Sequence, residues 1–261
     1  MEKLLEQITT GRSTAPRRLM LYGTHGVGKS TFASHAPKPV FIQTEDGLGE
    51  IECDKFPLIT TFDEAMQALS ELYTDKHAFR TVVVDSLDWL ERLIWAEVCR
   101  KRNVESIEDI GYAKGYVFAL SQWREFLDGL TALRNDRGMM VVLIAHARIE
   151  RFENPETESY DRYVPRLHRL ASQIVQEWCD EVLFANFKVY TKQTDEGFNR
   201  KRTHGIGTGE RILRTVERPA HVAKNRLNLP EEMPLDWIAY ARHLSRRAND
   251  APQDDKSKGA K

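Results

Sequence analysis

The sequence predicts an α/β domain with a mostly parallel central sheet, helices on both faces of that sheet and antiparallel strands at the C-terminal side. Apolar strand-like runs alternate with helix-like stretches along most of the chain, which is the pattern of parallel strands joined by helical crossovers. A glycine-rich turn joins the first apolar run to the first helical stretch. Toward the C-terminus, residues 187–193 and 211–218 have the pattern of antiparallel strands.

Each element can be assigned from an apolar run and the turn residues that bound it. Continuous apolar runs such as residues 79–86 favour strands that are buried on both faces. The other predicted strands are 17–23, 39–47, 138–148, the start of 57–75 and the end of 170–187. The predicted helices are 29–36, the amphipathic remainder of 57–75, 87–102, 113–136, the start of 170–187, and 234–247. We therefore expect one domain over 1–247, which includes a short N-terminal helix, and a disordered polar tail over 248–261.

Composition indicates a globular protein and excludes several other classes. Hydrophobic residues make up 41% of the 261 residues and charged residues 30%, as in ordinary soluble domains. The net charge of −1 gives no overall attraction for nucleic acid, so such a site would have to be a local patch. The three cysteines form no CxxC pair, which argues against a disulfide framework or a zinc site. No signal-like or membrane-length apolar run occurs, so a cytoplasmic protein without a membrane partner is expected.

The segment "GTHGVGKS", Gly23 to Ser30, fits the pattern G-x-x-x-x-G-K-[ST] of a phosphate-binding P-loop. It lies between a predicted strand and a predicted helix, and this agreement disfavours a chance glycine turn. Glycines allow the backbone N–H groups to surround a phosphate, Lys29 adds a cation, and the Ser30 hydroxyl is a ligand for Mg²⁺. The predicted ATP-binding residues are Gly23, Thr24, His25, Gly26, Val27, Gly28, Lys29, Ser30 and Thr31.

Two carboxylates are the candidates for metal binding and for activation of water. Asp85 ends the buried run "TVVVD" and is expected to hold Mg²⁺ with Ser30, although capping of the next helix is an alternative that can coexist with this role. Glu45 ends the strand that follows the P-loop helix, where strand ends line the ligand crevice. It is the candidate for orienting the attacking water. Asp46 is the neighbouring alternative, and an ordinary turn carboxylate is the other.

The order of P-loop, acidic strand end and "VVVDS" resembles the RecA superfamily of recombinases and ring helicases. This resemblance implies a RecA-like, AAA-type P-loop core in which Glu45 is the general base. It implies that His146, which ends "VVLIAH", senses the terminal phosphate, although a histidine that only caps a strand is the alternative. It also implies that Lys224 and Arg226 of "AKNR" reach the nucleotide of a neighbouring subunit, which requires a homo-oligomeric ring or filament. A solvated basic turn is the alternative for that pair.

The same resemblance indicates where DNA would bind. The segments "IGYAKGY" and "YDRY", with "TEDG" and "AKNR", resemble phage-encoded RecA-type proteins, a group that includes single-strand annealing proteins and recombinases. Basic groups can follow a phosphate backbone while aromatic rings stack on bases. Interspersed acidic residues in 147–170 weaken this prediction, and a solvated loop is the alternative. The candidate DNA-binding residues are Lys114 and Tyr116 in a first loop and Arg148, Arg151, Tyr160, Arg162 and Tyr163 in a second.

The leading hypothesis is therefore an ATP- and Mg²⁺-dependent ATPase that binds single-stranded DNA and acts in recombination. A single-strand-binding protein is the partner that the family implies, and the cytoplasm of a phage-infected bacterium is the expected location. One alternative is an ATP-driven switch for a protein partner, such as a helicase loader. A small-molecule P-loop kinase is a second alternative, but no arginine-rich lid is recognisable.

Overall fold

The computed structural model describes residues 5, 8, 10–11, 15–195 and 201–249. A parallel sheet forms its centre, in the order β7-β1-β5-β4-β2-β3. These strands are β1 (Arg18–Gly23), β2 (Pro39–Gln43), β3 (Asp54–Lys55), β4 (Thr81–Asp85), β5 (Met140–Phe152) and β7 (Glu181–Asp195). The predicted α/β class with a mostly parallel sheet is confirmed.

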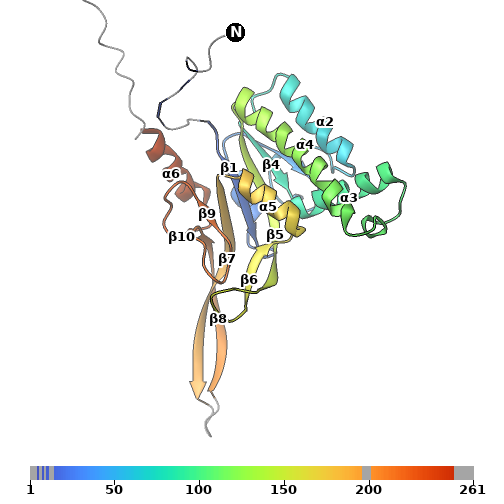
Figure 1. Ribbon diagram of the computed structural model, residues 1–261. Helices are drawn as coiled ribbons and strands as arrows, with labels where there is room; N and C mark the ends of the chain where they lie inside the picture. The colour runs from blue at the N-terminus through green and yellow to red at the C-terminus, as the bar shows by residue number, and fades with distance from the viewer. Residues whose placement is uncertain (1–4, 6–7, 9, 12–14, 196–200, 250–261) are drawn as a thin grey trace, which may run out of the picture.

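Antiparallel pairing extends the sheet on the side of β7, as predicted, but residues 187–193 continue β7 and do not form a separate strand. β8 (Lys201–Arg214) pairs with β7, and β10 (Glu232–Pro234) pairs with β8. The short strand β9 (Lys224–Asn225) pairs with the first residues of β7. β7 and β8 extend well beyond the layers of helices (Figure 1).

Helices cover both faces of the sheet and enclose two hydrophobic cores. One face carries α2 (Phe62–Thr74), α3 (Leu87–Arg102), α4 (Lys114–Asp136) and α5 (Arg169–Trp178), and the other carries α1 (Lys29–Ser34) and α6 (Trp237–Asn249) (Figure 1). Along β1, Met20 and Tyr22 face the first core, whereas Leu19 and Leu21 face the second. Because successive side chains of a strand point to opposite faces, a strand between two helical layers must be apolar throughout. No helix in the described ranges is both long and apolar enough to cross a membrane.

Three segments differ from the sequence-based expectations. Residues 57–60 form no strand, and the edge strand is instead β3. β5 does not end at residue 148 but continues to Phe152 and pairs with β6 (Tyr160–Pro165), so the predicted second loop is a β-hairpin. The final helix extends to Asn249, past the predicted start of the polar tail, and residues 250–261 lie outside the described residues. Most of the predicted N-terminal helix also lies outside them.

The carboxyl ends of β1, β2 and β4 lie along one edge of the sheet with His146 of β5, which pairs with Gly23, because these strands are parallel and adjacent. The P-loop therefore comes close to the residues that end the neighbouring strands. Gly23 is required where β1 ends, because a Cβ at this position would overlap the carbonyl oxygen of Ala185 on β7. Side chains that are far apart in the sequence are thus collected at one crevice.

Candidate functional site

The P-loop backbone adopts the conformation for which its glycines are needed. Gly26 has φ of +67° and Gly28 has φ of +102°, values in the left-handed region that favours glycine. α1 begins directly afterwards at Lys29. The loop borders a cavity of about 430 Å³, which is also lined by residues that follow β2, by Asp85 at the end of β4 and by His146 in the middle of β5. The predicted P-loop thus has both the backbone geometry and the open space that its role requires.

Lys29 is buried and held inside the loop. Its Nζ donates hydrogen bonds to the carbonyl oxygens of Gly23 and Thr24, at 3.2 and 2.9 Å. Burial lowers the pKa of Lys29, although the nearby carboxylates Asp85, Asp88 and Glu45 oppose this effect. The Thr24 hydroxyl is also buried, and it has no hydrogen-bond partner among the described residues. A buried cation that lines an open cavity fits an anionic ligand such as a phosphate group.

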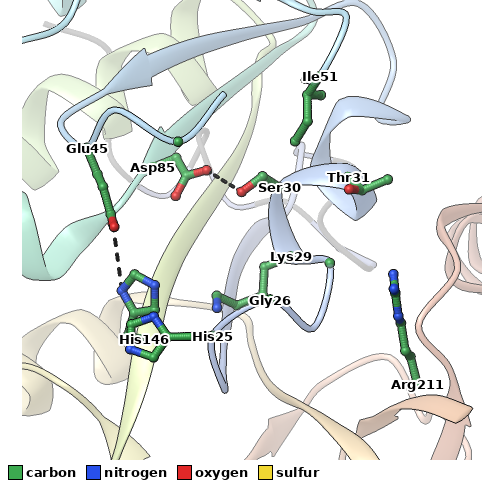
Figure 2. Close-up of a pocket in the computed structure, with 12 residues that line it drawn as sticks. His25, Gly26, Lys29, Ser30, Thr31, Glu45, Ile51, Asp85, His146 and Arg211 are labelled. Carbon is green, nitrogen blue, oxygen red and sulfur yellow. Dashed lines mark hydrogen bonds and ion pairs between the residues drawn. The ribbon is translucent and has the colours of Figure 1, made fainter. Parts of the chain in front are cut away.

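Ser30 and Asp85 form the candidate metal site. The Ser30 hydroxyl donates a hydrogen bond to Asp85 Oδ2 at 2.5 Å (Figure 2). Burial raises the pKa of Asp85, and the Ser30 hydrogen bond and the Lys29 charge partly offset this rise. A bound cation would favour the ionised carboxylate. Hard oxygen ligands of this kind suit Mg²⁺, which is usually held by one or two carboxylates together with phosphate oxygens. The residues therefore fit the predicted ion.

Glu45 and His146 face each other across the same cavity (Figure 2). Glu45 Oε2 accepts a hydrogen bond from the Ser86 hydroxyl at 3.0 Å and lies 3.8 Å from His146 Nδ1. The His25 ring stacks on the His146 ring, with 4.0 Å between centroids. Burial and the nearby His146, Arg166 and Lys29 charges lower the pKa of His25. Two predicted residues, Glu45 and His146, are thus brought together with a P-loop side chain, His25.

A buried ionic cluster holds His146 in place. Asp88 accepts hydrogen bonds from the backbone N–H of His146 at 3.1 Å and from its Nδ1, also at 3.1 Å. Arg166, which follows β6, forms an ion pair with Asp88 at 2.5 Å. Burial alone would raise the pKa of Asp88, but the hydrogen bonds from His146 and Arg166 hold it well below its usual range. Asp88 and Arg166 were not predicted, because no motif links them to the P-loop.

Three residues that line the cavity were also missed: Gly47, Ile51 and Arg211. Arg211 belongs to β8 and lies across the P-loop from Glu45 and His146 (Figure 2). Its sequence context, "RILR", has no feature of a nucleotide-binding motif. Only the antiparallel pairing of β7 with β8 brings this strand to the edge of the pocket.

The two predicted first-loop residues lie at the start of α4. Lys114 is the first residue of this helix and is exposed, with Nζ 5.9 Å from the centroid of the exposed Tyr112 ring. Tyr116 stacks on the His168 ring at 4.1 Å, and its hydroxyl contacts Glu108 at 3.4 Å. Lys114 is therefore accessible, whereas Tyr116 packs mainly within the protein.

The predicted second-loop residues lie on the β5–β6 hairpin. Arg148 pairs with Glu150 at 2.5 Å, and Arg151 pairs with Asp161 at 3.6 Å. Near the hairpin end, the ring of Phe152 lies 3.8 Å from the Arg162 guanidinium carbon and 5.5 Å from the Tyr160 ring. Tyr163 points inward instead and stacks on Phe184 at 4.9 Å. The hairpin thus carries three arginines and two aromatic rings near its end, together with acidic partners, while the third ring, Tyr163, packs inward.

Lys224 and Arg226 lie at the opposite edge of the sheet from the P-loop. Lys224 Nζ donates to the carbonyl oxygens of Gln176, Glu177 and Cys179, at the C-terminal end of α5, where a cation is favoured. Arg226 lies 3.4 Å from Asp180. β9 pairs with Glu181 and Val182, which in turn pair with Leu19 and Met20 of β1, so three to four residues of β1, roughly 10 to 13 Å, separate β9 from its own P-loop. A role at the nucleotide would therefore require a second subunit.

Comparison with known proteins adds three findings. Residues 15–227 match the model of the family described as AAA domain. The SPbeta prophage-derived uncharacterized protein YorG of Bacillus subtilis (strain 168) is 25% identical over 135 residues, a match that covers 49% of this chain and only 40% of that relative. A crystal structure of the RadB recombinase has a TM-score of 0.44 and 13% identity, over 83% of this chain and 85% of that chain. The family match includes every residue that lines the P-loop cavity.

Proposed function

The chain belongs to the AAA domain family, and from this premise we propose that it is a Mg²⁺-dependent ATPase that binds single-stranded DNA and acts in recombination. ATP would bind at the P-loop, between subunits of a homo-oligomer. The observation that carries the proposal is the continuity of β5, which has His146 in the pocket and extends as one strand to the basic hairpin. A nucleotide contact at His146 and a DNA contact at Arg148 or Arg151 would therefore both act on the same β-strand, β5.

The side chains of the pocket have distinct roles in this proposal. Lys29 would bind the phosphate chain, and Ser30 and Asp85 would hold Mg²⁺, which neutralises phosphate charge when it is bound. Glu45 would orient and deprotonate the attacking water. Its carboxylate is partly exposed to the cavity and is fixed by Ser86, which suits a base that must meet a solvent molecule. His146 would report whether the terminal phosphate is present.

The β5–β6 hairpin is the proposed contact for single-stranded DNA. Arg151 is 63% exposed, and its pairing with Asp161 is a surface ion pair that exchanges readily for a phosphate contact. Arg162 lies over the ring of Phe152, which in turn contacts the ring of Tyr160, and such rings can also stack on bases. Lys114 supplies a further exposed cation at the start of α4.

Steady-state ATP hydrolysis tests the proposal, measured without DNA, with single-stranded DNA and with duplex DNA, each at low and moderate salt. We expect hydrolysis that depends on Lys29 and is stimulated by single strands. An Arg151→Ala, Arg162→Ala double variant should lose most of the stimulation. Loss of each phosphate contact should reduce the slope of log affinity against log salt by about 0.7. Arg218→Ala is the matched control, because it removes an exposed arginine that pairs with Glu231 outside the hairpin.

A Lys29-dependent rate that no DNA changes would reject the DNA-binding part of the proposal. The alternative, an ATP-driven switch for a protein partner such as a helicase loader, would then be favoured. Phosphate transfer to a small acceptor, with no inorganic phosphate released, would indicate a kinase. If the stimulation by DNA is found, addition of a single-strand-binding protein would test the partner that the family implies.

A further inference from the structure

Arg211 is a cation beside the P-loop that the roles proposed above do not include. It lines the same cavity as Lys29, Ser30 and Thr31. A Cβ added at Gly28 would lie only 2.9 Å from Arg211 Nη1, so the guanidinium lies directly against the phosphate-binding loop. Within the described residues its guanidinium has no hydrogen-bond or ion-pair partner. Arg166, by contrast, forms an ion pair with Asp88.

The backbone at Arg211 is held firmly on both sides. Arg211 pairs with Phe187 on β7, and its carbonyl oxygen accepts a hydrogen bond from the N–H of Leu235 at 3.0 Å. The next two residues, Ile212 and Leu213, are almost completely buried. A side chain that projects from such a fixed strand loses little freedom of the backbone when it binds a ligand.

The position of Arg211 indicates which part of a nucleotide it would meet. Glu45, Asp85 and His146 lie on one side of the P-loop, and Arg211 lies on the other (Figure 2). The reacting phosphate must lie near Glu45, where water would be activated. The α-phosphate, sugar and base must therefore extend away from that group, toward the side on which Arg211 lies.

We propose that Arg211 binds the α-phosphate side of the phosphate chain, in the same subunit as the P-loop. The proposal rests on the nucleotide-binding role of the P-loop and adds a residue that no motif assigns. A guanidinium donates several hydrogen bonds in a fixed plane and remains charged at all relevant pH values, which suits it to phosphate. A contact of this kind is made equally with ATP and ADP. It therefore contributes to nucleotide affinity and leaves the rate of the chemical step unchanged.

Equilibrium titration with fluorescent N-methylanthraniloyl ATP and ADP, in the presence of Mg²⁺, tests the assignment. We expect Arg211→Ala and Arg211→Gln to weaken both nucleotides by the same factor, roughly tenfold to a hundredfold. Arg211→Lys should retain part of the affinity, because it keeps the charge. Arg214→Ala is the matched control, since it removes an arginine of the same strand that pairs with Glu232.

Three results would overturn the proposal. Unchanged affinity for both nucleotides in a folded Arg211→Ala protein would remove Arg211 from the site. Weakened binding of the triphosphate alone would assign it to the terminal phosphate instead. Failure of the wild-type protein to bind either nucleotide more tightly than Lys29→Ala would reject the P-loop site itself, and with it this role of Arg211. Circular dichroism and the unfolding temperature establish that each variant is folded.

Discussion

Glu91 provides a test of the structure that is independent of nucleotide and DNA. Its side chain lies on α3 and is 4% exposed. Both carboxylate oxygens accept a hydrogen bond from the backbone N–H of His168, at 2.9 and 3.1 Å. Burial raises the pKa of Glu91 to about 7, the hydrogen bond from His168 opposes this rise, and the negative charge of Asp88 adds to it. Glu91→Gln would keep an acceptor for His168 and remove the titration.

The size and sign of the effect follow from the pKa. The folded-state value of about 7 lies above the ordinary value of 4.5. At about 1.4 kcal/mol per pKa unit, the difference corresponds to roughly 3 kcal/mol. Because the folded protein binds this proton more tightly than the unfolded chain, the stabilising contribution is complete below about pH 4.5. This contribution is lost as the pH rises from about 4.5 to about 7. Above pH 7 the difference in unfolding free energy between the two proteins no longer changes. The free energy of unfolding of Glu91→Gln should therefore rise by roughly 3 kcal/mol relative to wild type between these limits.

Urea unfolding at several pH values between 4.5 and 7.5 measures this difference. The other groups that interact with Glu91 are present in both proteins, so their contributions to the pH dependence of the unfolding free energy largely cancel. These groups are Asp88 on the same helix, Arg148 on β5, Tyr116 on α4, and His168 before α5. Glu97→Gln is the control on the same helix, because hydrogen bonds from Arg100 lower the pKa of Glu97 and reverse the expected sign. Parallel pH profiles for wild type and Glu91→Gln would refute the proposed burial of this carboxyl group.

Three further substitutions test the site. Glu45→Gln should preserve nucleotide affinity and reduce hydrolysis by roughly a hundredfold or more, whereas Asp46→Asn should not; the reverse result would transfer the role of general base to Asp46. Gly23→Ala should lower the unfolding temperature by several degrees, because the new methyl group would overlap the carbonyl of Ala185 on β7; an unchanged melting curve would contradict the close approach of these strands. Asp88→Asn should weaken the contacts that Asp88 makes with Arg166 and His146, and it should reduce the rate of hydrolysis more than the affinity for ATP. A kcat equal to that of the wild-type protein would show that His146 does not need Asp88.

The residues predicted from the sequence are those that local rules can identify. The P-loop is a contiguous motif, and Glu45, Asp85 and His146 each follow or end an apolar run in the sequence. Parallel strands of one sheet bring their carboxyl ends to one edge, so the convergence of these three side chains follows from the fold class alone. Arg211, Asp88 and Arg166 could not be identified in this way. Arg211 reaches the pocket through the pairing of β8 with β7, and the other two through packing against His146.

The β5–β6 hairpin was predicted as a loop for a specific physical reason. A strand with one buried face alternates apolar and polar residues, and this alternation is what the sequence reveals. Beyond residue 147 the strand has no buried face, since Ile149 is 63% exposed and its neighbours Arg148 and Glu150 are only half-buried. The strand is maintained by backbone pairing with β6 rather than by a hydrophobic face. Such a strand leaves almost no pattern in the sequence.

Mixing experiments can separate the proposed roles of Arg211 and Arg226. If Arg226 acts across a subunit interface, a site needs Lys29 from one subunit and Arg226 from its neighbour. Arg226→Ala and Lys29→Ala subunits are each inactive alone in that case. Mixed in equal amounts and assembled at random, they should form intact sites at about a quarter of the interfaces, and activity should return to that level. No recovery at any ratio, once mixed assembly is established, would count against a role across the interface and leave Arg226 as the partner of Asp180.

Arg211 should behave in the opposite way. If it acts in the same subunit as the P-loop, every site in a mixture of Arg211→Ala and Lys29→Ala lacks one of the two cations, so mixing should restore nothing. The assay must use ATP well below the Kd of Arg211→Ala, because a high ATP concentration would mask a loss of affinity. Recovery in this mixture would place Arg211 at the nucleotide of a neighbouring subunit and overturn the assignment in cis. The two mixtures therefore distinguish the two arginines by a qualitative result that does not depend on how strongly either one binds.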